Sequence, residues 1–179
     1  MSVEKKRRLF FALWPSDAQQ QAIETSMRSR VESSRGRAIP ARNIHVTLAF
    51  LGSVAESRID AVNACADAVR GVPFEMEFDQ LETWARAHVL CLTASSIPAE
   101  LARIEEQLRF KLLSEHFEIR QEEYRPHVTL ARDVKRRSHR EAIEAIGWRV
   151  VDFVLVHSRS GPSGSEYEVV ERWALARSG

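Results

Sequence analysis

The sequence feature that most constrains this chain is a repeated tetrapeptide. His-Val-Thr-Leu occurs at residues 45–48 and again at residues 127–130, and an alanine follows each copy. In a β-strand, alternate side chains lie on the same face, so the histidine and threonine of each copy point one way and the valine and leucine the other. We therefore predict two half-buried strands. Each has its apolar pair in the core and its His-Thr pair turned toward a cleft or solvent.

Two such His-Thr pairs facing each other suit the chemistry of a phosphodiester. An imidazole has an ordinary pKa of about 6.5, so one of His45 and His127 can take a proton from water while the other gives one to a leaving oxygen. The hydroxyls of Thr47 and Thr129 can donate to the non-bridging phosphate oxygens, where charge builds in the transition state. A strained five-membered cyclic phosphate needs less electrophilic help than a linear diester, so this chemistry requires no metal.

The motifs and the segments around them resemble the 2H phosphoesterase superfamily, whose signature is a pair of H-x-[ST]-x motifs. Within it, the chain is most similar to the bacterial RNA 2′,3′-cyclic phosphodiesterases, also called 2′-5′ RNA ligases. The similarity extends over essentially the whole chain, in the expected order. The segments that carry it are RLFFALW at 8–14, NIHVTLAFLG at 43–52, RPHVTLAR at 125–132 and ERWAL at 171–175.

This resemblance implies a fold and an activity. The fold is α+β, with two mainly antiparallel sheets flanked by helices and related by a pseudo-two-fold axis. The whole chain, 1–179, forms a single domain of two lobes, with one motif in each lobe and a groove between them. The activity is hydrolysis of the 2′,3′-cyclic phosphate of RNA or of a nucleotide to a 2′-phosphate, without cofactor or metal. The same site running backward would join RNA ends through a 2′-5′ linkage.

Residue roles also follow from the resemblance. His45 would protonate the departing 3′-oxygen and His127 would activate the water, although pseudo-symmetry allows the reverse. Thr47 and Thr129 would hold the phosphate. Two further positions match family positions that contact the ligand: Arg132, which can pair with phosphate or stack on a base, and Phe11, which can stack on the nucleobase.

The periodicity of the rest of the chain predicts alternating strands and helices, as an α+β fold requires. Strands are predicted at 9–14, 43–51, 74–81, 89–93, 125–132, 150–156 and 167–176, with the third and fourth forming a hairpin. Helices are predicted at 16–33, 57–70, 98–116 and 138–146. Ser16 is the predicted N-cap of the first helix, whose apolar face comprises Ala22, Ile23, Met27 and Val31. A Gly/Ser/Pro loop is predicted at 158–165.

Composition limits the other possibilities. A net charge of +1 is low for a protein that coats nucleic acid, so contact with RNA should be local; the basic runs 5–8 and 135–137 are solvated or steer an RNA tail. The cysteines Cys65 and Cys91 form no C-x-x-C pair. The apolar run at 9–14 is too short for a signal peptide, and no run reaches the length of a membrane span. We expect a cytoplasmic monomer that does not bind membranes.

Three other hypotheses stay open at this point. A zinc site would need a third ligand at suitable spacing, which the sequence does not offer. A binding module would hold RNA ends or nucleotides in the same groove without turnover. A third hypothesis keeps the chemistry but takes a small cyclic nucleotide or an ADP-ribose cyclic phosphate as substrate. The remaining histidines lack a threonine partner and are interpreted as surface or structural residues: His88, His116, His139 and His157.

Overall fold

The computed structural model describes residues 4–119, 122–136, 140–161 and 164–176, and its central feature is one antiparallel sheet. The strands are β1 (Lys6–Leu13), β2 (Arg37–Ala38), β3 (Val46–Ala55), β4 (Phe74–Trp84), β5 (Val89–Thr93), β6 (His127–Arg132), β7 (Glu141–Val150), β8 (Asp152–Gly161) and β9 (Gly164–Ala174). The helices are α1 (Asp17–Ser34), α2 (Ile59–Asp67) and α3 (Ala99–Ser114), with short 3₁₀ turns η1 (Ala41–Asn43) and η2 (Glu56–Arg58).

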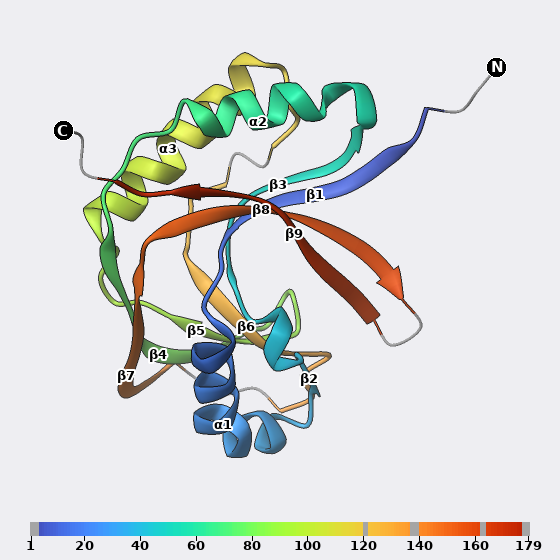
Figure 1. Cartoon of the computed structure of the whole chain (residues 1–179). Coiled ribbons are helices and arrows are strands. Elements are labelled where there is room, and N and C mark those ends of the chain that lie inside the picture. Colours follow the sequence, from blue (N-terminus) through green and yellow to red (C-terminus); the bar gives the residue numbers. More distant parts are fainter. Residues whose placement is uncertain (1–3, 120–121, 137–139, 162–163, 177–179) are drawn as a thin grey trace.

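The sheet divides into two lobes at its middle. Its strand order is β7-β4-β5-β6-β3-β1-β8-β9, with β2 pairing on β6. A single residue pair, Val46 with Val128, joins β3 to β6. We call β3, β1, β8 and β9 the first lobe, and β6, β5, β4, β7 and β2 the second lobe. Helices α2 and α3 cover the first lobe, and α1 lies against the second (Figure 1). The predicted α+β, bilobal architecture is confirmed, and the two predicted sheets are the two halves of one sheet joined by this single pair.

The two lobes repeat one arrangement. In the first, β1 leads through α1 to the motif strand β3, which pairs with β1. In the second, β5 leads through α3 to the motif strand β6, which pairs with β5. Each helix then contacts the motif strand of the other lobe, α1 against β6 and α3 against β3. This exchange of helices ties the two lobes together and gives the pseudo-two-fold relation.

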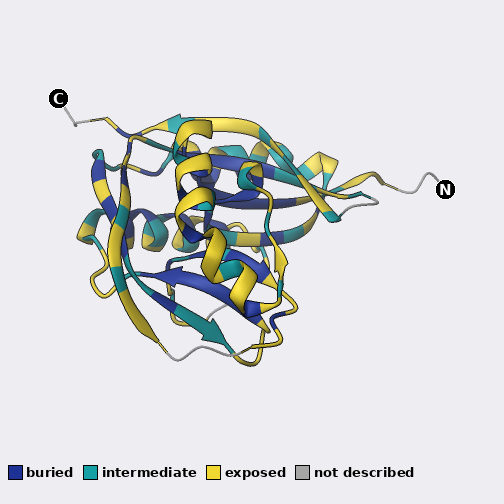
Figure 2. Cartoon of the chain, turned by 90° about the horizontal axis from the view of Figure 1, so that it is seen from below, coloured by how far each residue is buried: buried dark blue, intermediate teal, exposed yellow. Residues whose placement is uncertain are grey.

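The main core lies between the sheet and the helices. Figure 2 shows buried strands beneath helices whose outer faces are exposed. The predicted stripe on α3 is completely buried, and it comprises Leu101, Ile104, Leu108 and Leu112. Ser16 caps α1, as predicted, and also forms a capping box with Gln19. The apolar face of α1 differs from the prediction: Ala22 is exposed, and Gln20 is buried in its place.

Two predicted elements near the C-terminus are wrong. The predicted helix at 138–146 is the start of strand β7 from Glu141 onward; residues 138–139 lie outside the described part of the chain. The spacing of Ile143 and Ile146 suits a helix, but pairing with the edge of β4, where Ile146 lies opposite Phe78, overrides that local preference. The predicted loop at 158–165 is largely a continuation of β8 and β9, which pair up to Gly161 and Gly164.

Candidate active site

The two motifs meet where the lobes join. Because β3 and β6 are antiparallel and Val46 lies opposite Val128, the register places Thr47 across from His127 and His45 across from Thr129. The two valines are fully buried, whereas the histidines and threonines are partly exposed. The strand alternation predicted from the motif is confirmed. It brings two imidazoles and two hydroxyls, about a local two-fold axis, to one place.

Backbone carbonyls fix both imidazole rings. His45 Nδ1 lies 2.7 Å from the carbonyl oxygen of Asn43, and His127 Nδ1 lies 2.8 Å from that of Arg125. A carbonyl oxygen only accepts, so Nδ1 carries the hydrogen in both rings and Nε2 is the nitrogen that gains or loses a proton. In the first motif, Thr47 Oγ1 lies 3.1 Å from His45 Nε2 and donates to it when the ring is neutral.

Aromatic rings surround His45. Trp14 stacks on it with ring centroids 5.4 Å apart and planes 16° apart; Phe10 lies 5.0 Å away; Tyr167 meets it edge-on at 5.4 Å. Burial lowers the pKa of His45 to about 4, and the nearby charges of His127 and Arg132 act in the same direction against the Asn43 carbonyl. In the ligand-free protein His45 is therefore neutral at pH 7.

His127 has a different, more open setting. The ring of Trp84 lies 4.3 Å from its ring, and the Arg125 guanidinium lies over Trp84 at 4.9 Å from the ring centre while pairing with Glu82 at 2.8 Å. Burial lowers the pKa of His127, opposed by its bond to the Arg125 carbonyl. Both histidines thus start as neutral bases, with His45 the more deeply desolvated.

The carboxylate of Glu82 holds this neighbourhood together. Burial alone would raise its pKa, but the nearby polar groups of Trp84 and Thr93 and the charges of Arg125 and Arg140 lower it by more. Glu82 is therefore ionised at neutral pH. It pairs with Arg125, whose guanidinium lies over the Trp84 ring beside His127.

Arg132 ends the second motif strand and is exposed. Its positive charge acts on both His45 and His127, which places the guanidinium within electrostatic range of both rings. Thr129 lies opposite Cys91 on β5, whose Sγ is 4.0 Å from Thr129 Oγ1. Burial raises the pKa of the Cys91 thiol to about 12, so it is a neutral neighbour of Thr129.

Phe11 does not lie where the resemblance placed it. Its side chain is completely buried in the main core, against Phe153 and Trp173. The expectation that Phe11 stacks on a base is therefore contradicted. Its neighbour Phe10 points to the other face of β1, the face that carries His45.

Buried polar side chains, which the motif analysis missed, brace the segment that leads into the first motif. Gln20 on α1 donates from Nε2 to the Ile44 carbonyl at 2.9 Å. Asn43 donates from Nδ2 to the Ser165 carbonyl of β9 at 2.9 Å. From the connection that precedes β6, the Tyr124 hydroxyl donates to the Thr47 carbonyl at 3.2 Å. One signal of this bracing was available in the sequence: Gln20 lies three residues before Ile23, on the apolar face of the helix.

The two lobes present different surfaces beside the histidines. A small apolar cluster, separate from the main core, lies on the His45 side; its members are Phe10, Ala12, Val154 and Val156, with Trp14, Tyr167 and Val169 packed against them. The His127 side carries the polar group formed by Glu82, Thr93 and Arg125. A ligand between the lobes therefore meets an aromatic wall on one side and a polar wall on the other.

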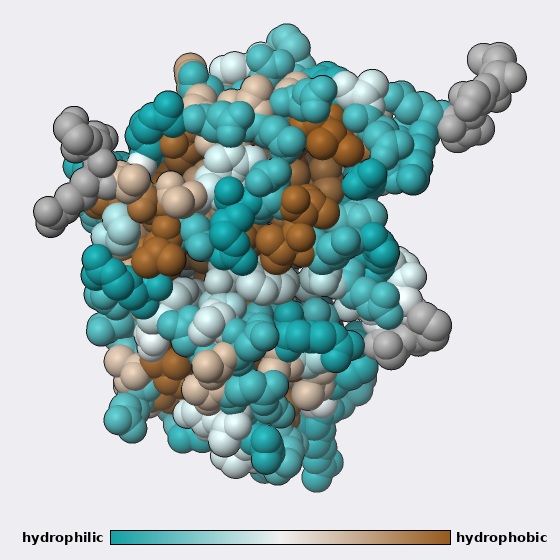
Figure 3. Space-filling view, viewed as in Figure 1, coloured by the Kyte–Doolittle hydropathy of each residue, from teal (hydrophilic) through white to brown (hydrophobic). Residues whose placement is uncertain are grey.

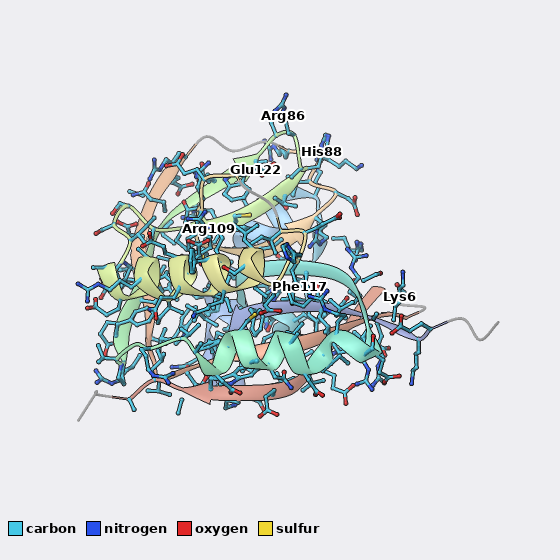
Figure 4. The ribbon with its side chains drawn as sticks, turned by 90° about the horizontal axis from the view of Figure 1, so that it is seen from above. Lys6, Arg86, His88, Arg109, Phe117 and Glu122 are labelled. Atoms are coloured by element: carbon cyan, nitrogen blue, oxygen red, sulfur yellow. The ribbon has the colours of Figure 1, made fainter. Side chains whose placement is uncertain are left out.

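The other histidines that the structure describes lie apart from this site. His88 is exposed at the turn between β4 and β5, beside Arg86 at the rim of the molecule (Figure 4). His116 follows α3 and is exposed, and His157 on β8 lies near Arg159 and Glu168. His139 lies outside the described residues. Within those residues no three His, Cys, Asp or Glu side chains converge as metal ligands, and no helix has the length and apolarity to cross a membrane.

A bilobal antiparallel fold with one His-x-Thr strand from each lobe defines the 2H phosphoesterase class. A family model described as the 2′-5′ RNA ligase superfamily matches residues 14–162, and the chain belongs to that superfamily.

Similar proteins agree with this placement. The RNA 2′,3′-cyclic phosphodiesterase of Escherichia coli K12 is 28% identical over 182 residues, covering 98% of this chain and all of the relative. The crystal structure of E. coli LigT complexed with 3′-AMP superposes with a TM-score of 0.89 at 26% identity, over 97% of this chain and 100% of that one. The crystal structure of TT0787 from Thermus thermophilus gives a TM-score of 0.79 at 25% identity, over 94% and 97% of the two chains.

Proposed function

We propose that this protein hydrolyses the 2′,3′-cyclic phosphate of RNA ends or nucleotides to a 2′-phosphate. The observation that carries the proposal is the Val46–Val128 pair, which sets two His-Thr pairs against each other with a local two-fold relation. One phosphorus atom between them has an imidazole on each side for attack and departure. The name of the E. coli relative, an RNA 2′,3′-cyclic phosphodiesterase, supports the same reaction.

In the proposed reaction His127 acts as the base and His45 as the acid. Nε2 of His127 takes a proton from water as the water oxygen bonds to phosphorus. The bond from phosphorus to the 3′-oxygen breaks, and Nε2 of His45 gives its proton to that oxygen, which leaves a 2′-phosphate and a 3′-hydroxyl. Two settings support this division of roles. His127 is the more open to water, and the rings around His45 can stabilise an imidazolium by cation–π contact.

Substrate binding would raise the pKa of His45, so that His45 takes up a proton from solvent. In the free protein His45 is neutral because burial lowers its pKa to about 4. A phosphate anion between the motifs favours the imidazolium and opposes that effect, so His45 becomes charged when substrate is bound. His45 is then protonated, and able to act as the acid, only when substrate is bound.

The threonines and Arg132 would bind the phosphate itself. The hydroxyls of Thr47 and Thr129 lie on the same face as the histidines and would donate to the non-bridging oxygens. Thr47 donates to His45 Nε2 in the free protein, so this hydroxyl would turn to the phosphate once His45 is protonated. The charge of Arg132 would offset the charge that develops on phosphorus oxygens. Ring strain in the cyclic phosphate makes a metal unnecessary in this scheme.

We assign stacking on the nucleobase, the role expected of Phe11, to the aromatic rings beside His45. Trp14 and Tyr167 are partly exposed, and both contact His45. We place the nucleobase against these two rings, which offer a flat face and an edge at low cost in conformational entropy. The ribose then lies next to His45, where the 3′-oxygen needs its proton.

The same site can run in reverse and join RNA ends through a 2′-5′ bond, although hydrolysis prevails in water without a coupled energy source.

A module that binds RNA ends or nucleotides without turnover is the second candidate. It would need neither an unprotonated second imidazole nor a fixed Nδ1–H tautomer in both rings. We also propose that the chain acts as a monomer and as a single domain, since both histidines and both lobes come from the same chain. A cytoplasmic location is part of the same proposal.

The reaction is tested by incubating the purified protein with 2′,3′-cyclic AMP in EDTA and separating 2′-AMP from 3′-AMP by chromatography. Formation of 2′-AMP alone is the expected result. Formation of 3′-AMP would reverse the assigned bond cleavage. If neither 2′,3′-cyclic AMP nor an RNA ending in a cyclic phosphate turns over, while both bind, the protein is the non-catalytic binding module.

A further inference from the structure

A strongly basic surface lies at β2 and the end of β6, beside the candidate active site. It is formed by Arg35 and Arg37, after α1, and by Arg132, Lys135 and Arg136, at and after the end of β6; we call it the basic mouth. All five side chains are exposed. In Figure 3 the region around β2, at the lower right, is mainly hydrophilic, whereas the hydrophobic patches of this face gather higher up.

The fold, rather than the sequence alone, assembles the basic mouth. Arg37 lies directly opposite Arg132 in the β2–β6 pair. The backbone N–H groups of Lys135 and Arg136 donate to the Ser34 carbonyl at the end of α1, at 3.2 and 3.0 Å. Two segments about 100 residues apart in the chain thus bring their cations to one surface.

This surface carries more positive charge than the whole chain. Segments 35–37 and 132–136 contain five cationic side chains and one carboxylate, Asp133, a net charge of +4 in a protein whose total is +1. Asp133 pairs with Arg37 at 3.4 Å, but both groups are more than half exposed, so the pair is weak. Two arginines directly opposite in a sheet repel each other. The juxtaposition of Arg37 and Arg132 is therefore unfavourable alone and becomes favourable when an anion binds to both side chains.

The basic mouth adjoins the candidate active site, because Arg132 is the last residue of β6, the strand that carries His127 and Thr129. Arg132 acts electrostatically on both His45 and His127. Arg37, next to it, reaches from the second lobe toward the first, because a β-carbon placed on Gly164 of β9 would lie 3.6 Å from Arg37 Nη1. The cations therefore form a track that starts at the end of the motif strand β6 and runs past the turn end of the β8–β9 hairpin.

We propose that the basic mouth binds the phosphodiester backbone of an RNA strand whose cyclic phosphate occupies the active site, so that oligonucleotide ends are preferred over mononucleotides. This inference rests on the proposed function. A nucleotide with a 2′,3′-cyclic phosphate is attached to the rest of its strand through its 5′-oxygen, so the remaining phosphates lie outside the catalytic centre, and the exposed cations beside it can bind them. Sequence-independent contacts from Arg and Lys to phosphates are sensitive to salt.

The experiment compares 2′,3′-cyclic AMP with a tetranucleotide that ends in a cyclic phosphate. For the unaltered protein we expect kcat/KM to be about tenfold higher for the tetranucleotide at low salt, with a log–log salt slope steeper by about 2 if three single-strand phosphates are contacted. Arg37→Ala should make the log–log salt slope shallower by about 0.7, and the Lys135→Ala, Arg136→Ala double variant should make it shallower by about twice as much. Turnover of 2′,3′-cyclic AMP should change less than about twofold, because a mononucleotide has no strand to bind.

The matched control is the double variant Arg103→Ala with Arg109→Ala. It removes the same charge from α3, in the helical layer that covers the first lobe (Figure 4). This control should keep the tetranucleotide preference. Equal kcat/KM for both substrates, or a preference that survives Arg37→Ala and the Lys135/Arg136 double variant, would overturn the inference while leaving the proposed function intact.

Binding separates the inference from catalysis. Affinity for the same tetranucleotide with a 2′-phosphate end, measured by fluorescence anisotropy, should fall in the basic-mouth variants and not in the α3 control. If no cyclic phosphate is turned over but this pattern appears, the hydrolase proposal fails and the RNA-binding surface stands. If affinity is equal in all variants, the surface is not an RNA site.

Discussion

His45 and His127 occupy equivalent positions in a repeated motif, yet they differ in what surrounds them. Both rings donate Nδ1–H to the carbonyl two residues earlier. His45 then packs among Trp14, Phe10 and Tyr167, whereas His127 has Trp84 beside it and a carboxylate nearby. The sequence repeat supplies two identical chemical groups, and the unequal lobes give them unequal basicity.

This inequality predicts a separation of pH profiles. kcat/KM reports the free protein, in which burial holds the pKa of His45 at about 4 and that of His127 below its ordinary value. The form with His45 protonated and His127 neutral becomes scarcer as the pH rises above these values, so kcat/KM should peak below pH 6.5, roughly the ordinary histidine pKa. Bound phosphate raises the pKa of His45, so the alkaline limb of kcat should lie at least about one pH unit higher. Coincident limbs for kcat and kcat/KM would contradict this.

Thr47 and Thr129 predict an effect on rate with little effect on folding. Replacing either by valine keeps the strand shape and removes one donor to the phosphate oxygens, so kcat should fall about 10- to 1000-fold. Thr25→Val, on the exposed side of α1, is the matched control and should keep full activity. Normal kcat in both motif variants would show that the hydroxyls do not contact the phosphate in the transition state.

At the scale of elements, Asn43 links the segment that leads into β3 to the start of β9. Its carbonyl orients His45, and its side chain donates to Ser165 at the start of β9, the strand that carries Tyr167. Asn43 is a positioning residue, since its contacts are with His45 and the hairpin.

Asn43→Ala should lower kcat about tenfold or more and reduce stability by about 1–3 kcal/mol, because it leaves the Ser165 carbonyl without its partner. The Nδ1–H signal of His45 should also broaden or move in NMR spectra, while that of His127 stays. Asn63→Ala, which removes an amide oxygen without a partner from α2, is the control and should leave stability and both histidine signals nearly unchanged. An unchanged His45 signal would contradict the positioning role.

The elements also show what the sequence can and cannot predict. The strand character of the motifs, the cap at Ser16 and the stripe of α3 are local patterns, and the structure confirms them. The run at 9–14 is apolar on both faces, so alternation does not say whether Phe10 or Phe11 faces the site, and β1 has bulges that shift its register. The start of β7 follows from its partner β4, a long-range pairing with no local signal.

At the scale of the molecule, the active site exists only where two lobes meet. The Val46–Val128 pair joins residues 82 positions apart, and nothing in either motif alone specifies that they face each other. The repeat indicates that the two motifs act together, and the contacts of α1 with β6 and of α3 with β3 hold the two lobes in this arrangement.

Ligand binding should therefore stabilise the whole fold. The product 2′-AMP contacts both lobes in the proposed complex, and a ligand at 100 times its Kd adds about 2.7 kcal/mol to stability. For a chain of this length that corresponds to a rise in Tm of roughly 5–10 °C, measurable by calorimetry. The Thr47→Val, Thr129→Val double variant should lose most of the rise. An equal rise in that double variant would place the ligand elsewhere.

The most direct test of the two-histidine account is a double-mutant cycle on the hydrolysis of 2′,3′-cyclic AMP with His45→Ala, His127→Ala and the combined variant. Because the acid and base act in one step, each single change should lower kcat by about 10³-fold or more, and the double change should cost little beyond either alone. Circular dichroism should show all three variants folded. If either single variant keeps near-normal kcat, or if the two losses simply multiply, the histidines do not act as one acid–base pair.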